Sequence, residues 1–375
     1  MFCPLPKLTS MTKTPQISAI APPSRPDPRE GEERLAPTED ALSLPGHIAS
    51  SGALDRLVET ARDYARHAAS ENTLKAYAKD WAQFARWCRM RGADPLPPSP
   101  ELIGLYIADL AAPQGRVATL SVASIERRLS GLGWAYAQRG HPLDRKDRHI
   151  ASVLAGIRRK HARPPVQKEA ILPEDLRDML DTLPHDLRGL RDRAMLLIGF
   201  AGGLRRSEIV SLDHGKDDTP DSGGWAEILE GGVLLTLRGK TGWREVEIAR
   251  GSSDQTCPVH ALTQWLHYAR IDFGPLFVAV SRNGLKATGA RLSDKHVARL
   301  IKQTVEDAGL RPELSKAERL ALYSGHSLRA GLASSAEVDE RYVQKQLGHA
   351  SAEMTRRYQR RRDRFRVNLT KAAGL

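Results

Sequence analysis

An arginine and a glutamate follow a pair of glycines in the segment Gly202-Gly203-Leu204-Arg205-Arg206-Ser207-Glu208. The glycines end one predicted apolar helix and a second helix begins, which leaves Arg205 near the start of that second helix. A guanidinium group at such a position can bind a phosphate. Glu208 lies one helical turn further on, so its carboxylate is expected to pair with Arg205 and hold it still, although an ordinary surface ion pair has the same pattern.

A histidine and an arginine stand three residues apart in Ser324-Gly325-His326-Ser327-Leu328-Arg329. The glycine marks a predicted helix start, so His326 and Arg329 are expected to share one face and to point at one anion. A capping histidine beside a surface arginine is the structural alternative.

A second histidine lies beside a glycine, in Leu347-Gly348-His349, and Tyr358 follows it by nine residues. A tyrosine oxygen can act as a nucleophile when a neighbouring group accepts its proton. A lone tyrosine is more often a core aromatic, and Tyr323 and Tyr342 are competitors for the nucleophile's role.

A lysine lies in a glycine-rich turn, Gly239-Lys240-Thr241-Gly242, between two apolar and alternating segments. These segments predict a β-hairpin over residues 233–248. Lys240 in this turn is a candidate acid, and a solvated turn lysine is the alternative. A phosphate-binding loop also ends in Gly-Lys-Thr, but position 234 holds leucine where that motif needs its first glycine, so ATP binding is disfavoured.

In this order, the six residues resemble the complete active-site signature of the tyrosine recombinase (phage integrase) family: Arg205, Lys240, His326, Arg329, His349 and Tyr358. The resemblance covers residues 54–370, because Asn72 to Tyr77 resembles the opening helix of the family's N-terminal domain. Departures are modest. Gly202 stands where the family often has Thr or Ser, Gln359-Arg360 replaces a usual Thr-His, and the loop before the hairpin is longer than typical.

The resemblance implies a DNA recombinase that works by transesterification through a 3′-phosphotyrosyl bond at Tyr358, with no metal or other cofactor. Arg205 and Arg329 would hold the phosphate, with Glu208 in support, and Lys240 would protonate the leaving oxygen. His326 would accept the tyrosine proton and His349 would donate a hydrogen bond, although the sequence leaves this division open. The alternatives are strand relaxation like that of a type IB topoisomerase, or a DNA-binding relative without activity.

The fold class expected is mainly α with a small β-sheet. Residues 1–50 are expected to form a disordered tail, residues 51–160 a helical domain and residues 161–168 a linker. The resemblance implies that the helical domain is a core-binding (SAM-like) domain and that residues 169–375 form the catalytic domain with a C-terminal tail. It also implies that the two domains form a C-shaped clamp around DNA. Helical periods occupy residues 54–68, 74–88, 101–111, 121–138, 147–160, 258–270 and 293–308, and helices are expected over 327–370; residues 213–224 predict a polar loop.

The chain carries 57 Lys and Arg against 45 Asp and Glu, a formal charge of +12, which favours a polyanionic partner over a merely solvated surface. Basic side chains expected to contact DNA are Lys75, Lys79, Arg127, Arg128, Arg158, Arg159, Lys160, Arg163, Arg356 and Arg357. The three cysteines show no zinc-ligand spacing, and a lone Cys257-x-x-His260 lacks a second pair, so no metal is expected.

The resemblance implies that double-stranded DNA is the partner, with four protomers on two synapsed sites and possible accessory DNA-bending or directionality proteins. The tail after Tyr358 could dock on a neighbouring protomer or fold back on its own domain. The sequence has no apolar stretch long enough to span a bilayer, so a cytoplasmic, nucleoid-associated protein is expected. The target site, and a role as integrase, resolvase or transposon enzyme, are left open.

Overall fold

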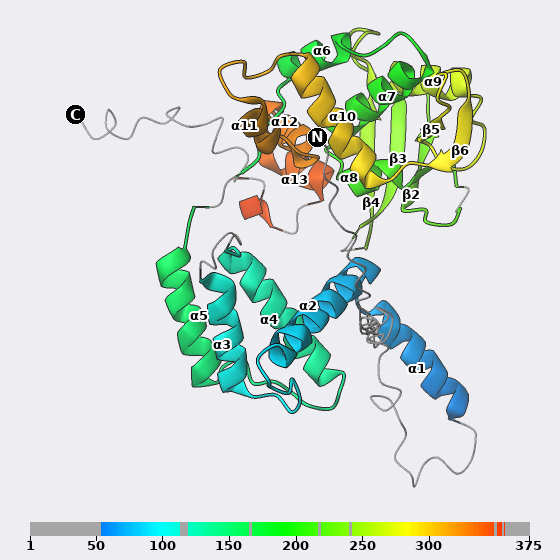
Figure 1. Cartoon of the computed structure of the whole chain (residues 1–375). Coiled ribbons are helices and arrows are strands. Elements are labelled where there is room, and N and C mark those ends of the chain that lie inside the picture. The colour runs from blue at the N-terminus through cyan, green and yellow to red at the C-terminus, as the bar shows by residue number, and fades with distance from the viewer. Residues whose placement is uncertain are drawn as a thin grey trace, which may run out of the picture. The chain divides into compact units, whose positions relative to one another are not determined.

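The computed structural model describes residues 54–112, 119–164, 167–216, 219–239, 242–348, 351–354 and 356. The chain divides into two compact units, and the division falls between Pro164 and Pro165 (Figure 1). This division lies inside the segment 161–168 that the sequence predicts as a linker. The predicted tail, residues 1–50, lies outside the described residues.

The first unit is built from helices in its described part: α1 (Asp55–His67), α2 (Glu71–Arg89), α3 (Pro100–Ala111), α4 (Val122–Ala137) and α5 (Arg148–His161). Serine side chains cap three of them. Ser70, Ser99 and Ser121 each accept a hydrogen bond from the main-chain N–H three residues further on. Each such cap is worth about 1 kcal/mol, which fixes where these helices begin.

Aromatic side chains fill the core of the first unit. The ring of Phe84 on α2 lies 5.0 Å from that of Tyr106 on α3, and Trp81 lies 5.2 Å from Tyr136 on α4, each pair edge to face. Such pairs add about 1 kcal/mol to the burial of their area. On α1, by contrast, the predicted apolar positions Leu57 and Tyr64 are exposed, so their part of that helix does not belong to this core.

The second unit carries the remaining described helices: α6 (Pro173–Asp181), α7 (Leu187–Ala201), α8 (Arg206–Val210), α9 (Pro258–Ala269), α10 (Asp294–Asp307), α11 (Lys316–Leu322), α12 (His326–Ser335) and α13 (Glu340–Leu347). The predicted helical region 327–370 is interrupted between Ser335 and Glu340 and again at Gly348. Gly348 adopts a left-handed conformation (φ 59°), which ends α13 and turns the chain before His349.

A four-stranded sheet packs against these helices, with strands in the order β1 (Leu212–His214), β2 (Gly224–Ile228), β3 (Gly232–Gly239) and β4 (Gly242–Ala249). The predicted hairpin is confirmed, because β3 and β4 pair in antiparallel register from Gly232↔Ala249 to Gly239↔Gly242. The predicted loop 213–224 is wrong at both ends, because it overlaps β1 and the start of β2.

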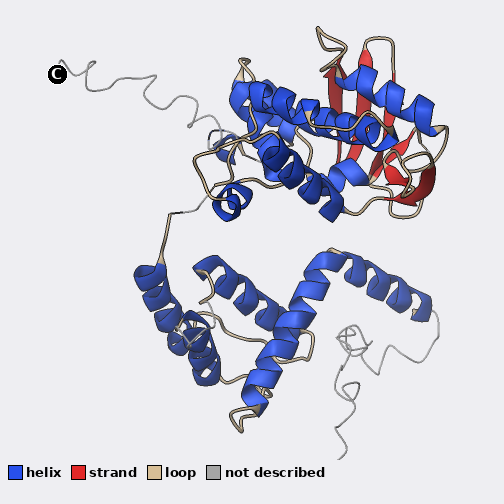
Figure 2. Ribbon diagram, turned by 45° about the horizontal axis from the view of Figure 1, so that its top comes forward, coloured by secondary structure: helices blue, strands red, loops and turns tan. Residues whose placement is uncertain are grey.

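The two short strands β5 (Val278–Val280) and β6 (Ala287–Arg291) form a second, separate sheet. Figure 2 shows the strands of the second unit gathered at one side, with most of its helices at the other. The predicted class, mainly α with a small β component, is therefore confirmed.

The helix α7 is a buried helix of the second unit, and the chain passes from its end into the turn that carries Arg205. Its side chains from Ala194 to Ile198 are all buried. The helix ends at Gly202 and Gly203, and Gly203 has φ 56°. A Cβ atom on Gly203 would lie 2.5 Å from a methyl of Leu347, so only glycine fits between α7 and α13 at this point.

Candidate active site

Arg205 stands directly before α8, where the extended backbone after Gly203 turns into the helix. Its Nη1 atom donates to Glu208 Oε1 at 2.6 Å, and its main-chain N–H donates to Glu208 Oε2 at 2.8 Å. The predicted pairing of Arg205 with Glu208 is therefore confirmed. The Arg205 side chain is 39% exposed, so the guanidinium is held at one edge and open at the other.

Glu208 is nearly buried and is shared between two arginines. Arg244 of β4 donates from Nη2 to Glu208 Oε2 at 2.9 Å, and its side chain is only 14% exposed. Burial by itself would raise the pKa of Glu208, but the charges of Arg244 and Arg205 and the main-chain hydrogen bond of Arg205 outweigh it and lower the pKa. Glu208 is therefore ionised and can hold both guanidinium groups at neutral pH.

Arg329 lies on α12 and is 2% exposed. Its Nη1 atom donates to the carbonyl of Gly203 at 2.5 Å, and its Nη2 atom donates to the carbonyl of Leu347. The side chain therefore joins the glycine turn before Arg205 to the end of α13 before His349. An arginine has five N–H donors, so these bonds use only part of its capacity.

His326 is the first residue of α12 and is exposed over only part of its surface. Partial burial of its ring, followed by the charges of Arg329, Arg205 and Arg206, lowers its pKa. These charges act on the ring because the three arginines lie around it. The aliphatic part of Arg206 packs on Gly325, where a Cβ would lie 3.0 Å from Arg206 Cδ. The structure thus brings Arg205, His326 and Arg329 together.

The other three residues of the predicted set, Lys240, His349 and Tyr358, lie outside the described residues. Their flanks are described: Gly239 and Gly242 close the β-hairpin around Lys240, and Gly348 precedes His349.

The two competing tyrosines differ in their surroundings. Tyr323 is 2% exposed, and burial, with the nearby charges of Glu169 and Asp175, raises its pKa to about 12. Burial of this kind disfavours the phenolate and keeps the hydroxyl away from a substrate. Tyr342 on α13 is 70% exposed.

Residues 169–364 match the Phage integrase family. The match spans more than half of the chain, and a relative that aligns with most of the chain supports it. The integrase/recombinase xerD homolog of Selenomonas ruminantium is 33% identical over 329 residues, 84% of this chain and 89% of the relative. This chain belongs to the phage integrase family.

The chain is also similar to the tyrosine recombinase XerD of Mycobacterium leprae, with 27% identity over 76% of this chain and 86% of the relative. The predicted function is thereby confirmed: the chain is a tyrosine-type DNA strand transferase that cleaves and rejoins DNA in site-specific recombination.

Solved structures support the same fold. The XerH recombinase in a post-cleavage complex has a TM-score of 0.55 at 18% identity, covering 88% of this chain and 85% of that chain. A lambda integrase tetramer bound to a Holliday junction has a TM-score of 0.51 at 17% identity, covering 84% and 79%. At these identities the likeness shows the fold alone.

The basic residues predicted to contact DNA divide into two groups in this phage integrase family member. Several pair with acidic side chains: Lys75 with Glu71, Arg127 with Asp80, Arg158 with Glu126 and Arg356 with Glu340. Arg128 is only 17% exposed in its side chain, lies 4.0 Å from Asp80 and donates to the hydroxyl of Tyr106.

Asp80 is 2% exposed, so Arg127 and Arg128 serve to pair a buried carboxylate. Lys79, Arg159, Lys160 and Arg163 are exposed, and Arg357 lies outside the described residues. Contact of any of these residues with DNA stays a prediction.

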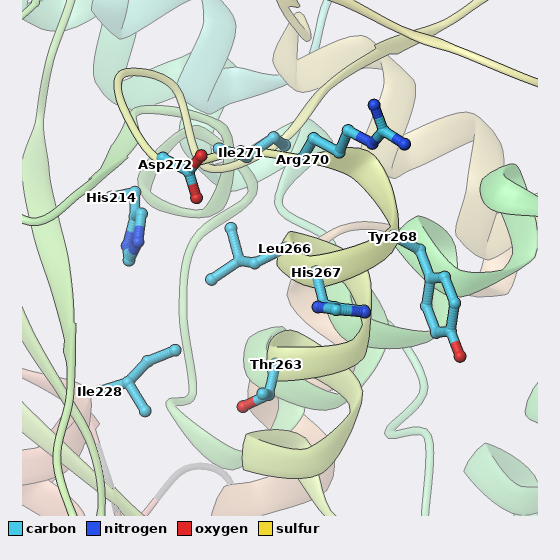
Figure 3. A pocket seen from close by; sticks show the side chains of 9 residues that line it. All are labelled: His214, Ile228, Thr263, Leu266, His267, Tyr268, Arg270, Ile271 and Asp272. Atoms are coloured by element: carbon cyan, nitrogen blue, oxygen red, sulfur yellow. The ribbon is translucent and has the colours of Figure 1, made fainter.

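A cavity of about 650 Å³ lies elsewhere in the second unit (Figure 3). His214 of β1, Ile228 of β2 and Thr263 of α9 line it, together with the loop residues from Arg270 to Asp272. None of the predicted catalytic residues is among the side chains that line it. In the described part of the chain, Nδ1 of His214 is buried and has no hydrogen-bond partner.

Within the described residues, no group of three His, Cys, Asp or Glu side chains could hold a metal ion. Cys257 is buried and caps α9, where its sulfur accepts from the main chain of His260 at 3.4 Å. The Cys-x-x-His spacing is therefore explained by a helix cap. In the same part of the chain, no helix is both long enough and apolar enough to cross a membrane.

Arg244 is the site residue that the sequence reasoning missed, although a signal for it exists. Arg244, Val246 and Ile248 occupy alternate positions of β4, and the two apolar ones are buried. A charged residue in the inward phase of an alternating strand requires a buried partner. That partner is Glu208.

Proposed function

We propose that Tyr358 is the nucleophile of this recombinase and that Arg205, His326 and Arg329 bind the phosphodiester that it attacks. The phenolic oxygen forms a bond to phosphorus and the bond from phosphorus to the 5′-oxygen breaks, which leaves a 3′-phosphotyrosyl linkage and a 5′-hydroxyl. A 5′-hydroxyl then reverses the reaction on either the same or a partner strand. One phosphodiester replaces another, so no nucleotide energy source is needed. The observation that carries this proposal is the convergence of the three residues in one cluster.

The two arginines supply charge. In the transition state, negative charge gathers on the non-bridging oxygens, and guanidinium groups can bind these oxygens without losing their charge near neutral pH. The exposed edge of Arg205 suits this contact because Glu208 orients its other edge. Arg329 supplies its charge from a buried position, and the hydrogen bonds of its side chain to the carbonyls of Gly203 and Leu347 fix it between the turn before Arg205 and the end of α13.

Two protons must move. Tyrosine has an ordinary pKa of about 10, so attack near neutral pH requires a base. His326 is that base, because its lowered pKa keeps the ring neutral and able to accept a proton at neutral pH. His349 donates a hydrogen bond to the phosphate, and Lys240 protonates the leaving 5′-oxygen from its hairpin turn.

Duplex DNA is the substrate, and recombination takes place in an oligomer. The complexes named for the similar solved structures motivate both statements: XerH with its substrate, and the lambda integrase tetramer on a Holliday junction. By extension, a tetramer synapses two sites, accessory DNA-bending or directionality proteins select the direction, and the protein acts on the nucleoid in the cytoplasm.

The test uses a labelled half-site with a nick a few nucleotides beyond the scissile phosphate, selected from DNA that flanks the gene. The short 5′-hydroxyl fragment diffuses away after cleavage, so the covalent protein–DNA adduct accumulates. We expect a denaturation-resistant adduct with the wild type in EDTA, and none with Tyr358→Phe, which keeps the ring and removes the nucleophile. An unchanged adduct with Tyr358→Phe contradicts the proposal.

A second pair of assays distinguishes recombination from relaxation. Strand exchange between two plasmid-borne copies of the half-site's parent sequence should depend on both copies. Relaxation of a supercoiled plasmid without exchange would instead indicate an activity like that of a type IB topoisomerase. Binding without any adduct would indicate a relative that has lost catalysis.

A further inference from the structure

Arg244 occupies a position that connects three parts of the proposed site. It lies on β4, four residues after Lys240 in the hairpin. Its side chain points to the buried face of the sheet, where its Nη2 atom donates to Glu208. The opposite oxygen of Glu208 accepts from Arg205. One carboxylate therefore lies between an inner arginine and an outer one.

The same side chain also contacts the end of α13. Its Nη1 atom lies 3.4 Å from the carbonyl oxygen of Gln346. A Cβ atom on Gly348 would lie 2.7 Å from Nε of Arg244, so the turn before His349 packs directly against the guanidinium. Gln346 in turn donates from Nε2 to the carbonyls of Ala201 and Glu247, which ties α13 to α7 and to β4.

The charges around Glu208 indicate that Arg244 does more than fill space. Arg205 and Arg244 share the carboxylate of Glu208, so the three side chains together carry one net positive charge. Arg205 is the more exposed of the two arginines. Without Arg244, the negative charge of Glu208 would act on Arg205 alone and draw its guanidinium inward. Arg205 would then be less able to stabilise charge on a phosphate.

We propose that Arg244 is a positioning residue for strand cleavage, which orients Arg205 through Glu208 and holds the end of α13 through the carbonyl of Gln346. This inference rests on the proposed phosphate-binding role of Arg205. Arg244 itself need not touch DNA, because its contacts with Glu208 and Gln346 are directed inward.

Arg291 provides a matched control in the same unit. Its side chain is 15% exposed, close to the 14% of Arg244, and it pairs with the fully buried Asp213 at 2.5 Å. Its other bonds go to the carbonyls of Val210 and Leu212 and to Thr219, and none of these is a predicted catalytic residue. Arg291→Gln therefore measures the loss of a buried ion pair without the connection to Arg205.

The experiment compares Arg244→Gln, Arg244→Lys and Arg291→Gln on the nicked half-site, with the cleavage rate at saturation and the half-site affinity measured separately. Misplacement of a group by about 1 Å can cost on the order of 10²-fold in rate. We expect Arg244→Gln to lose about that factor in rate with unchanged affinity, and Arg244→Lys to recover part of it. We expect Arg291→Gln to cleave at the wild-type rate in conditions where it is folded.

The pathway is tested by combining Arg244→Gln with Arg205→Ala. If Arg244 acts through Arg205, the double variant cleaves little more slowly than Arg205→Ala alone, because coupled residues are not additive. Independent losses that multiply, a wild-type rate for Arg244→Gln, or equal losses for Arg244→Gln and Arg291→Gln would each overturn the inference. A wild-type rate for Arg205→Ala would instead overturn the proposed function.

Discussion

Arg205, in the turn before α8, and Arg329, on α12, are held in place by different kinds of contact. Arg205 is 39% exposed and is oriented by a carboxylate one turn away, whereas Arg329 is buried and is oriented by carbonyls of two distant segments. Both are predicted to serve one phosphate. The difference teaches that a shared catalytic role does not imply a shared structural role, and substitutions can separate the two.

The largest effect is expected for Arg329→Ala. This variant leaves the carbonyls of Gly203 and Leu347 without their guanidinium partner and leaves a space inside the second unit. Each unpaired buried polar group costs about 1–3 kcal/mol, so the free energy of unfolding should fall by about 2–5 kcal/mol. Urea unfolding followed by circular dichroism measures this loss, and adduct formation should be lost with it.

Arg329→Lys is the control for charge. An ammonium keeps the charge but cannot reproduce the planar fork that reaches two carbonyls, so stability should remain low. Wild-type stability for Arg329→Ala would show that its buried bonds contribute nothing, and the comparison with Arg205 would fail.

A smaller and narrower effect is expected for Arg205→Ala. The side chain is partly exposed, and Glu208 keeps Arg244, so the unfolding free energy should change by less than about 1 kcal/mol. The cleavage rate should fall about 10²- to 10³-fold, as for the loss of one donor to a developing oxyanion. Single-turnover cleavage of the nicked half-site checks this. A loss of stability as large as that of Arg329→Ala would remove the contrast.

The smallest effect is expected in the pH dependence of the cleavage rate, which the protonation of His326 should set. His326 can accept a proton only when its ring is neutral, and the neutral form predominates above its pKa. Because the surroundings lower this pKa, the cleavage rate should stay high to a pH below the ordinary 6.5 and then decline. Arg206→Gln removes one of the charges that lower the pKa. Its acid limb should therefore move to higher pH, with the plateau rate at high pH unchanged.

The rate–pH profiles of wild type and Arg206→Gln provide the measurement. An acid limb that moves to lower pH in Arg206→Gln, or a wild-type profile without an acid limb, would contradict the assignment of His326. The lowered pKa also affects stability, because the unfolded chain binds a proton at His326 more readily than the folded chain does. The contribution of His326 to the free energy of unfolding is therefore fully present above pH 6.5 and is lost as the pH falls through the lowered pKa.

The contrast between the two arginines also explains what the sequence could predict. The pairing of Arg205 with Glu208 depends on residues one helical turn apart, and the helix boundary is marked by two glycines, so local rules suffice. The hairpin around Lys240 is similarly local, because its strands follow each other in the chain.

The burial of Arg329 could not be predicted in this way. Its partner Gly203 lies 126 residues away in the chain, and nothing near Arg329 in sequence indicates that contact. The strand β1 was missed for the same reason, since its three residues pair in parallel with β2 across an intervening loop. Likewise, nothing near Arg127 and Arg128 in sequence indicates that both lie beside the buried Asp80, which is 47 residues from Arg127.

The most direct test is to identify the residue that becomes attached to DNA. The adduct formed on the nicked half-site in EDTA is digested with a protease and a nuclease, and the peptide that retains a nucleotide is sequenced by mass spectrometry. The account predicts a single modified residue, Tyr358. A nucleotide on exposed Tyr342, on buried Tyr323 or on a residue that is not a tyrosine would contradict it.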